Sequence, residues 1–215
     1  MITIKYMNKS YNKKTVLKDI NASFVDGKVY GIVGLNGAGK TTFFNCLSGL
    51  IDFEGTITHD TLSPLKNHLG YVPTEPYFFP RTKGIEYLHF IQHAKGADAI
   101  AAALPAMFEL PLDEYIDHYS TGMKRKIAFT GAMVGDAAIY ILDEPFNGVD
   151  IKSNLVLKRK ILELKEHQKT IFISSHIVSS LTELCDEVHL LKDGKFVLRY
   201  MPEQFDQIEN DLMEL

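Results

Sequence analysis

The sequence predicts an α/β fold: a mostly parallel sheet flanked by helices, with an antiparallel β subdomain and an inserted helical subdomain. From residue 137 onward, apolar strand patterns alternate with helical patterns, the order that produces a parallel sheet covered on both faces. Near residue 30, an apolar strand leads into a glycine-rich loop and then a helix. Between residues 83 and 135 the pattern is helical, so we place the inserted subdomain at about residues 75–135.

Local signals place each element of the first half of the chain. The apolar and turn patterns predict strands over residues 1–7, 20–34 and 68–73, a helix over 41–50 and a short alternating segment over 54–60. Asp26 and Gly27 break the second strand with a turn, and the helix ends near Gly49. The inserted subdomain contains helical segments over residues 83–96, 97–110 and 120–135.

The second half repeats the order of strand and helix. We predict strands over residues 137–145 and 169–176, helices over 151–167 and 177–187, a hairpin over 188–200 and a short helix over 202–210. Asp193 and Gly194 mark the turn of the hairpin, because this residue pair adopts the positive backbone angles of a two-residue turn. No internal repeat or low-complexity tract is present, so we expect a single domain over residues 1–215.

Composition and charge argue against several classes of protein. The formal net charge of -4 provides no general basic field, so we expect no nucleic-acid partner. The sequence has no secretory-signal pattern and no stretch of about 18 apolar residues that could span a bilayer, so we expect a cytoplasmic protein. Cys46 and Cys185 lack metal-ligand spacing and are expected to be reduced thiols in the core.

The segment GLNGAGKTTF, residues 34–43, has the pattern of a phosphate-binding loop. Gly34 and Gly39 are followed by Lys40 and Thr41. Such a loop directs backbone N–H groups at phosphate oxygens, while the lysine reaches the outer phosphates and the hydroxyl can ligate Mg²⁺. A plain glycine-rich turn is the alternative, but the position of the segment between a predicted strand and a predicted helix favours phosphate binding.

Two adjacent carboxylates, Asp143 and Glu144, end the buried strand of residues 137–145. Near a phosphate loop, a carboxylate at a strand end is placed to hold Mg²⁺, and its neighbour can face the attacking water. Side chains alternate along a strand, so the two carboxylates point in different directions and need not share a role. A solvated junction between strand and loop is the alternative.

A second helix start suited to an anion is predicted in YSTGMKRK, residues 119–126. Ser120 is a suitable N-cap, Gly122 leaves the backbone accessible, and a basic triplet follows over residues 124–126. An ordinary helix cap with a solvated charged face is the alternative for this segment by itself.

Five segments in sequence order resemble the nucleotide-binding subunits of ABC transporters, which have the P-loop NTPase fold. They are GLNGAGKTT at 34–42, YSTGM at 119–123, IYILDEP at 139–145, NGVD at 147–150 and SSH at 174–176. The resemblance covers essentially the whole chain and is strongest toward bacterial drug, bacteriocin or lantibiotic exporters. It implies a Mg²⁺-dependent ATPase that converts ATP and water to ADP and phosphate.

The resemblance also implies roles for individual residues. Glu144 matches the general base that polarises water, His176 the histidine that contacts the γ-phosphate, and Asp150 an acid that helps join two subunits. Asp143 and Thr41 match the Mg²⁺ ligands. The residues implied in ATP binding are Tyr11 and Val16 at the adenine, Asn36, Gly37, Ala38, Gly39, Lys40, Thr41 and Thr42 at the phosphates, and Ser120 and Gly122 at a second subunit's nucleotide.

In this family two subunits pair head to tail, so Ser120 of one chain is expected to face the nucleotide held by Lys40 of the other. ATP closes such a dimer because it binds the closed state better, and hydrolysis lets the dimer open. The resemblance thus implies a homodimer or heterodimer that drives a separate transmembrane permease subunit. The permease is expected to dock near residues 74–95, with the chain peripheral on the inner face of the cell membrane and export favoured over import.

Three features depart from the family pattern. Thr74 stands where the family has a glutamine that senses Mg²⁺ and the membrane partner, so either Glu75 substitutes or the coupling is looser. Thr121 and Met123 replace a glycine and a glutamine of the second helix start, and Phe146 stands where a small hydroxyl residue is commoner. Two alternatives stay open: a soluble ABC-type ATPase without a membrane partner, and a module that binds ATP but hydrolyses it weakly.

Overall fold

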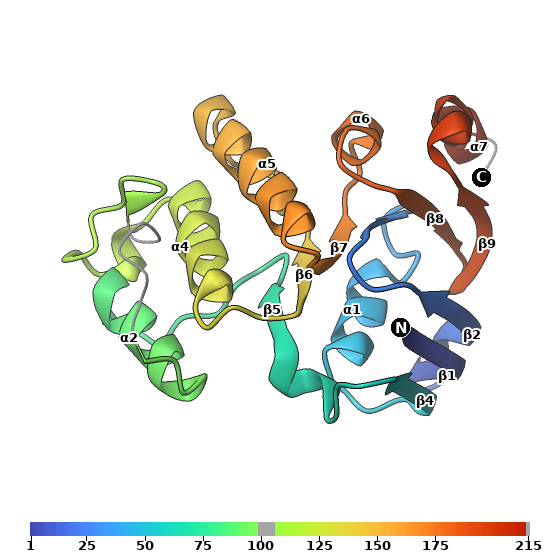
Figure 1. Ribbon diagram of the computed structural model, residues 1–215, viewed down its shortest axis with the longest axis horizontal. Coiled ribbons are helices and arrows are strands. Elements are labelled where there is room, and N and C mark those ends of the chain that lie inside the picture. The colour runs from blue at the N-terminus through green and yellow to red at the C-terminus, as the bar shows by residue number, and fades with distance from the viewer. Residues whose placement is uncertain (99–105, 214–215) are drawn as a thin grey trace.

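The computed structural model describes residues 1–98 and 106–213 and contains two sheets (Figure 1). Its strands are β1 (Ile2–Tyr11), β2 (Lys14–Phe24), β3 (Val29–Val33), β4 (Glu54–His59), β5 (Leu69–Val72), β6 (Ile139–Asp143), β7 (Thr170–Ser174), β8 (Glu187–Lys192) and β9 (Lys195–Tyr200). The larger sheet has the order β5-β6-β7-β3-β8-β9 and is parallel from β5 to β8, with β9 antiparallel at its edge. The smaller sheet, β2-β1-β4, is antiparallel. The predicted fold class is confirmed.

Helices cover both faces of the larger sheet (Figure 1). They are α1 (Lys40–Leu47), α2 (Gly84–Ala94), α4 (Thr121–Met133), α5 (Ile151–Glu166), α6 (Val178–Thr182) and α7 (Ile208–Met213), with short 3₁₀ helices η1 (Leu65–His68), η2 (Ile116–His118) and η3 (Pro202–Gln207). Among the described residues, no helix combines the length and apolarity needed to cross a bilayer. Half of the helix predicted over residues 97–110, namely residues 99–105, lies outside the described part of the chain.

The larger sheet separates two apolar cores. Along β6, Tyr140 and Leu142 belong to the core built with α4, α5 and α6, whereas Ile139 and Ile141 belong to the core built with α1 and the smaller sheet. Successive side chains of a strand point to opposite faces, so this division shows a sheet that is buried on both sides. Burial of one such isoleucine stabilises the fold by about 1.5–3 kcal/mol.

Helix α4 joins the sheet to the inserted helices. Its Phe129 lies in the core shared with the sheet, while its Ile127 packs with Leu88 of α2 and Ile116 of η2 in a third cluster. In Figure 1, α2 and α4 lie together at the end of the molecule opposite β1, β2 and β4. Any movement of α2 and η2 relative to the larger sheet therefore involves α4, which packs against both.

Several elements differ from the boundaries predicted by the sequence. The strand β1 continues to Tyr11, beyond the predicted end at residue 7. The strand β2 begins at Lys14, before the predicted residue 20, because pairing with β1 stabilises a polar segment that lacks a buried-strand pattern. Helix α6 ends at Thr182, whereas the prediction extended to residue 187. It ends early because Asp186 pairs with β3: its carboxylate accepts a 2.9 Å hydrogen bond from Val29 N, and its N–H donates a 2.8 Å bond to Val29 O.

Candidate functional site

The glycine loop connects β3 to α1, as the sequence predicts. Gly39 caps α1 with a φ of 110°, a left-handed conformation that glycine adopts without steric cost. Gly34 approaches the neighbouring strand so closely that a Cβ there would lie 2.3 Å from Leu191 O. Glycine is therefore required at both ends of the loop, once for its backbone angle and once for its lack of a side chain.

Lys40 is buried at the first position of α1 and curls back over this loop. Its Nζ donates a 2.7 Å hydrogen bond to Gly34 O. Burial lowers the pKa of Lys40, while the nearby charges of Glu144 and Asp143 act in the opposite direction. A largely desolvated ammonium beside the N-terminus of a helix makes this point of the surface attractive to an anion.

A hollow of about 380 Å³ lies over the loop and the start of α1. It brings together the sequence-predicted residues Val16, Asn36, Gly37, Gly39, Lys40, Thr41, Thr42, Asp143 and Glu144. Lys14 and Thr74 also line it, and neither had a predicted binding role. Thr74 Oγ1 is buried without a hydrogen-bond partner among the described residues, while Glu75 is exposed and does not line the hollow.

Three predicted residues lie beside this hollow rather than on it: Ala38, Tyr11 and His176, which contacts Glu144. Ala38 lines an adjoining hollow of about 190 Å³ together with Asp193 of the β8–β9 turn. Tyr11 pairs across the first hairpin with Lys14, and Lys9 Nζ lies 5.2 Å from the centroid of its ring. The ring is thus near the rim of the hollow and half exposed.

Asp143 and Thr41 form the candidate metal position. Asp143 is buried at the end of β6, and its Oδ2 accepts a 2.7 Å hydrogen bond from Thr41 Oγ1. Ser174 Oγ donates to the other carboxylate oxygen. No group of three His, Cys, Asp or Glu side chains within residues 1–98 and 106–213 could hold a metal by itself. The two oxygens suit Mg²⁺, which proteins commonly bind through one or two groups with substrate phosphates completing the shell.

Glu144 is held at its backbone and at its side chain. Its φ is 53°, a conformation that costs a non-glycine residue about 1–3 kcal/mol. Such a conformation persists only where contacts with the surroundings compensate for this cost. Its N–H donates a 2.9 Å hydrogen bond to Ser174 Oγ, and its Oε2 lies 2.8 Å from His176 Nδ1. The buried carboxylate is therefore fixed at the edge of the hollow with an imidazole beside it, as a general base requires.

Ser120 and Gly122 lie apart from this hollow within one chain. Ser120 caps α4 by accepting a 3.2 Å hydrogen bond from Met123 N. A Cβ on Gly122 would lie 2.8 Å from Gly148 O, so the helix start packs tightly against the loop that follows β6. Neither residue is among those that line the hollow over Lys40.

Ser174 is the functional residue that sequence reasoning left without a role. It pairs with Asp143 in the parallel register of β6 and β7 and bonds both Asp143 and Glu144. The signal that could have identified it is its position at the carboxyl end of a predicted strand, where a neighbouring strand also ends in functional residues.

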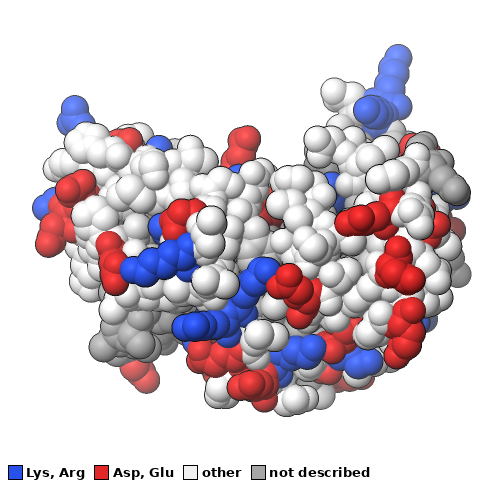
Figure 2. Space-filling model, turned by 90° about the horizontal axis from the view of Figure 1, so that it is seen from above, with Lys and Arg blue, Asp and Glu red and all other residues white. Residues whose placement is uncertain are grey.

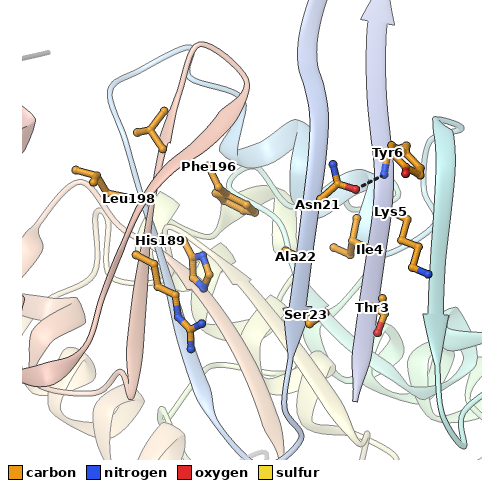
Figure 3. A pocket seen from close by; sticks show the side chains of 12 residues that line it. Thr3, Ile4, Lys5, Tyr6, Asn21, Ala22, Ser23, His189, Phe196 and Leu198 are labelled. Atoms are coloured by element: carbon orange, nitrogen blue, oxygen red, sulfur yellow. Dashed lines mark hydrogen bonds between the residues drawn. The ribbon is translucent and has the colours of Figure 1, made fainter.

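Another hollow, of about 740 Å³, lies between β1, β2 and β9 (Figure 3). Its lining includes Asn21, whose Oδ1 accepts a 2.9 Å hydrogen bond from Tyr6 N, and the rings of His189 and Phe196. It contains no carboxylate and shares no residue with the hollow over Lys40. It therefore lacks the groups needed for phosphate chemistry, in contrast to the smaller hollow.

Charged side chains are mixed in sign on the face shown in Figure 2. Acidic and basic residues are interspersed there, and the described residues of that face form no extended basic field. On this face, no extended basic field adds to the local geometry of the glycine loop as a candidate anion site.

Comparison with known proteins agrees with this geometry. The family model described as "ABC transporter" matches residues 17–147. An uncharacterized ABC transporter ATP-binding protein of Methanocaldococcus jannaschii is 32% identical over 91% of this chain and 76% of its own length. The lantibiotic transport ATP-binding protein SrtF of Streptococcus pyogenes is 29% identical over 98% of this chain and 93% of its own length.

Solved structures show the same fold. The structure of an ATP-binding subunit of an ABC transporter superimposes with a TM-score of 0.88 at 25% identity, covering 99% of this chain and 94% of that one. A dimeric ATP-binding cassette bound to ADP and Pi, in a post-hydrolysis state, superimposes with a TM-score of 0.85 at 20% identity, covering 94% of this chain and 99% of that one.

Proposed function

The chain belongs to the ABC transporter family, and from that premise we propose that it hydrolyses ATP to power transport of a substrate through a separate transmembrane permease subunit. One observation carries the proposal: the phosphate loop, the Thr41–Asp143 oxygen pair and Glu144 line one hollow, and His176 contacts the Glu144 carboxylate. These are the parts that phosphoryl transfer to water requires: an anion cradle, a metal position and a base.

The triphosphate is bound by the start of α1. Backbone N–H groups of the loop and Lys40 receive the phosphate oxygens, so the Lys40 ammonium exchanges its bond to Gly34 O for a charged partner. Thr41 and Asp143 would hold Mg²⁺, which when bound neutralises charge on the outer phosphates. Val16 and the half-exposed Tyr11 are placed by the first hairpin on the side where the adenine would lie.

Glu144 acts as the general base. Its carboxylate accepts a proton from the water that attacks the terminal phosphate, and His176 fixes the carboxylate by its contact with Oε2. The Glu144 carboxylate contacts His176, whereas the Asp143 carboxylate is bonded by Thr41 and Ser174. The two carboxylates can therefore serve different roles.

A second subunit completes each site in this proposal. Ser120 and Gly122 are at an exposed helix start that does not line the hollow of their own chain, so they are available to a nucleotide held by another chain. The proposed assembly is a head-to-tail homodimer or heterodimer. ATP binding closes it because the nucleotide contacts both chains only in the closed state.

An exposed aromatic cluster supports the docking of a membrane partner. Tyr77, Phe79 and Phe90 are 76%, 58% and 56% exposed, and their rings meet edge to face at 5.6 and 5.9 Å. Such apolar rings gathered at a surface are typical of an interaction site. Tyr77 and Phe79 follow Thr74, which lines the hollow, by only a few residues. A permease bound at the aromatic cluster would therefore be connected to the nucleotide site through this short segment. The proposed location of the protein is therefore the cytoplasmic face of the membrane.

Export is the proposed direction of transport. SrtF is named as a lantibiotic transport protein, SkfE of Bacillus subtilis as a peptide export protein, and LnrL of the same organism as a linearmycin resistance protein. The proposed direction rests on these names, because the cargo is expected to pass through the permease and not through this chain. The catalytic unit is one nucleotide-binding domain over residues 1–215 with a helical insertion.

The experiment that tests the function compares the wild type with Glu144→Gln. We expect the variant to bind ATP, to remain as a stable dimer on a sizing column and to lose about a hundredfold or more in phosphate release, the usual scale of a positioned base. Equal turnover in the two proteins would refute the role of Glu144. Steady phosphate release by the wild type would dismiss a weakly hydrolysing module, and co-purification of ribosomal material in place of a membrane protein would favour the soluble alternative.

A further inference from the structure

Helix α4 contacts the loop that carries the base at three points. This loop, residues 144–150, runs from the end of β6 to the start of α5 and is called the base loop below. Arg125 Nη1 donates a 2.7 Å hydrogen bond to Glu144 O, at the first residue of the loop. Lys126 Nζ lies 2.6 Å from the carboxylate of Asp150, at the last residue. Gly148, which lies between Glu144 and Asp150 in the loop, packs against Gly122 of the helix. The base loop therefore lies along the first turns of α4.

Glu144 is the residue of the base loop whose conformation needs support. Its φ of 53° is left-handed, and it is followed by a proline. Few neighbouring groups can therefore form hydrogen bonds that stabilise its backbone conformation. Ser174 of the neighbouring strand binds its N–H, and Asn147 N donates a weaker 3.2 Å bond to its carbonyl oxygen. Arg125 supplies the short bond to that carbonyl oxygen, and it is a charged donor.

Arg125 is committed to this one contact. Its Nε is buried with no hydrogen-bond partner in the described part of the chain, and the side chain forms no ion pair there. Desolvating a guanidinium in this way is costly unless its remaining donors are well placed. Arg125 does not line the hollow over Lys40, so within its own chain it reaches that site only through Glu144.

We propose that Arg125 is a positioning residue that holds the backbone of Glu144, and that α4 thereby links the base of its own chain to the nucleotide contacted by Ser120. The inference rests on the proposed function and deepens it. The start of α4 faces the site of a second subunit, whereas Arg125, little more than one turn later, acts on the site of its own chain. A shift of α4 when Ser120 meets a γ-phosphate is transmitted to the carbonyl of Glu144. The two ATP sites of a dimer are then coupled through one helix in each chain.

The test uses the full-length chain with three substitutions. Arg125→Met keeps an unbranched apolar stem and removes the donors, Arg125→Lys keeps a charged donor, and Arg159→Met makes the same change at an exposed position of α5. For Arg125→Met we expect kcat to fall about 10- to 100-fold, the scale of a misplaced catalytic group, with the KM for ATP within about twofold of wild type. Arg125→Lys should restore kcat to within about threefold, and Arg159→Met should leave it unchanged.

A double-substitution cycle separates positioning from a structural role. In the Glu144→Gln background, Arg125→Met should cause no further loss in residual turnover, because the base it positions is absent. An additive loss, or a parallel loss of ATP binding and melting temperature with no split between kcat and KM, would overturn the inference. Wild-type turnover in Arg125→Met would overturn it while leaving the proposed function intact. Absence of ATPase activity in the wild type would instead reject the proposed function, and the inference with it.

Discussion

Thr41 and Asp143 are 102 positions apart in sequence, yet Thr41 Oγ1 donates a 2.7 Å hydrogen bond to Asp143 Oδ2. The bond joins the first turn of α1 to the carboxyl end of β6. Because Ser174 Oγ donates to the other oxygen of Asp143, this carboxylate is fixed from two sides before any ligand is bound. In the proposed function Asp143 is a metal ligand, and a carboxylate held in this way does not need to be reoriented when phosphate binds.

Asp143→Asn should remove the Mg²⁺ dependence of ATP binding. The amide can accept the bond from Thr41 or from Ser174 with its one oxygen, but it lacks the negative charge that attracts the metal. We expect wild-type affinity for ATP to rise at least about tenfold on adding Mg²⁺, and that of the variant to stay within about twofold. Calorimetric titrations with Mg²⁺ and with EDTA measure both values. The exposed Asp136→Asn is the control, and an equal response to Mg²⁺ in all three proteins would contradict the assignment.

Lys40→Ala should abolish tight ATP binding. The substitution removes the cation of the loop and leaves Gly34 O without its buried donor. A lost charge-assisted contact of about 1.5–3 kcal/mol corresponds to a loss of about ten- to a hundredfold in affinity, as measured by calorimetry. Lys5→Ala, at the hollow between β1, β2 and β9, is the matched control and should bind like the wild type. Unchanged affinity in Lys40→Ala would show that the loop does not hold the phosphates.

The pair Phe79→Ser and Phe90→Ser, combined in one chain, should weaken capture of the membrane partner without changing ATP binding. Both rings are exposed and meet at 5.9 Å, so their loss removes apolar contact area while leaving the cores intact. The measurement is the amount of polytopic membrane protein that co-purifies from detergent extract. Tyr6→Ser, another exposed aromatic substitution, serves as the control. Full recovery of the partner with the double variant would rule out docking at this cluster.

Acid should destabilise the fold partly through Glu187. Burial alone would raise the pKa of this carboxyl, but hydrogen bonds and charge from His189 and Arg199 outweigh burial and hold the pKa below its ordinary value of 4.5. A carboxyl whose folded pKa is depressed stabilises the fold above the unfolded pKa, and this stabilisation is lost as the pH falls through the folded pKa. Urea unfolding at pH 7 and at successive values below 4.5 should therefore show a smaller pH dependence for Glu187→Gln than for the wild type.

The elements that could be predicted from sequence are those specified by neighbouring residues. The glycine loop is an example, because the backbone angles of Gly39 and the helix start at Lys40 depend on residues within one turn. The buried strand over Ile139–Asp143 is another, since its apolar run marks a strand covered on both faces. The early start of β2 at Lys14 could not be predicted, because pairing with β1 rather than its own pattern makes it a strand.

By itself, the sequence determined the fold class, the phosphate loop and the family, because each depends on local patterns in a recognisable order. Only the tertiary structure decided that Ser174 binds both Asp143 and Glu144, that Thr74 rather than Glu75 lines the hollow, and that Arg125 reaches Glu144 O. The physical reason is that these contacts depend on the register of parallel strands and on how α4 packs against the sheet. Both are set by burial of two apolar cores over the whole chain, which no local pattern encodes.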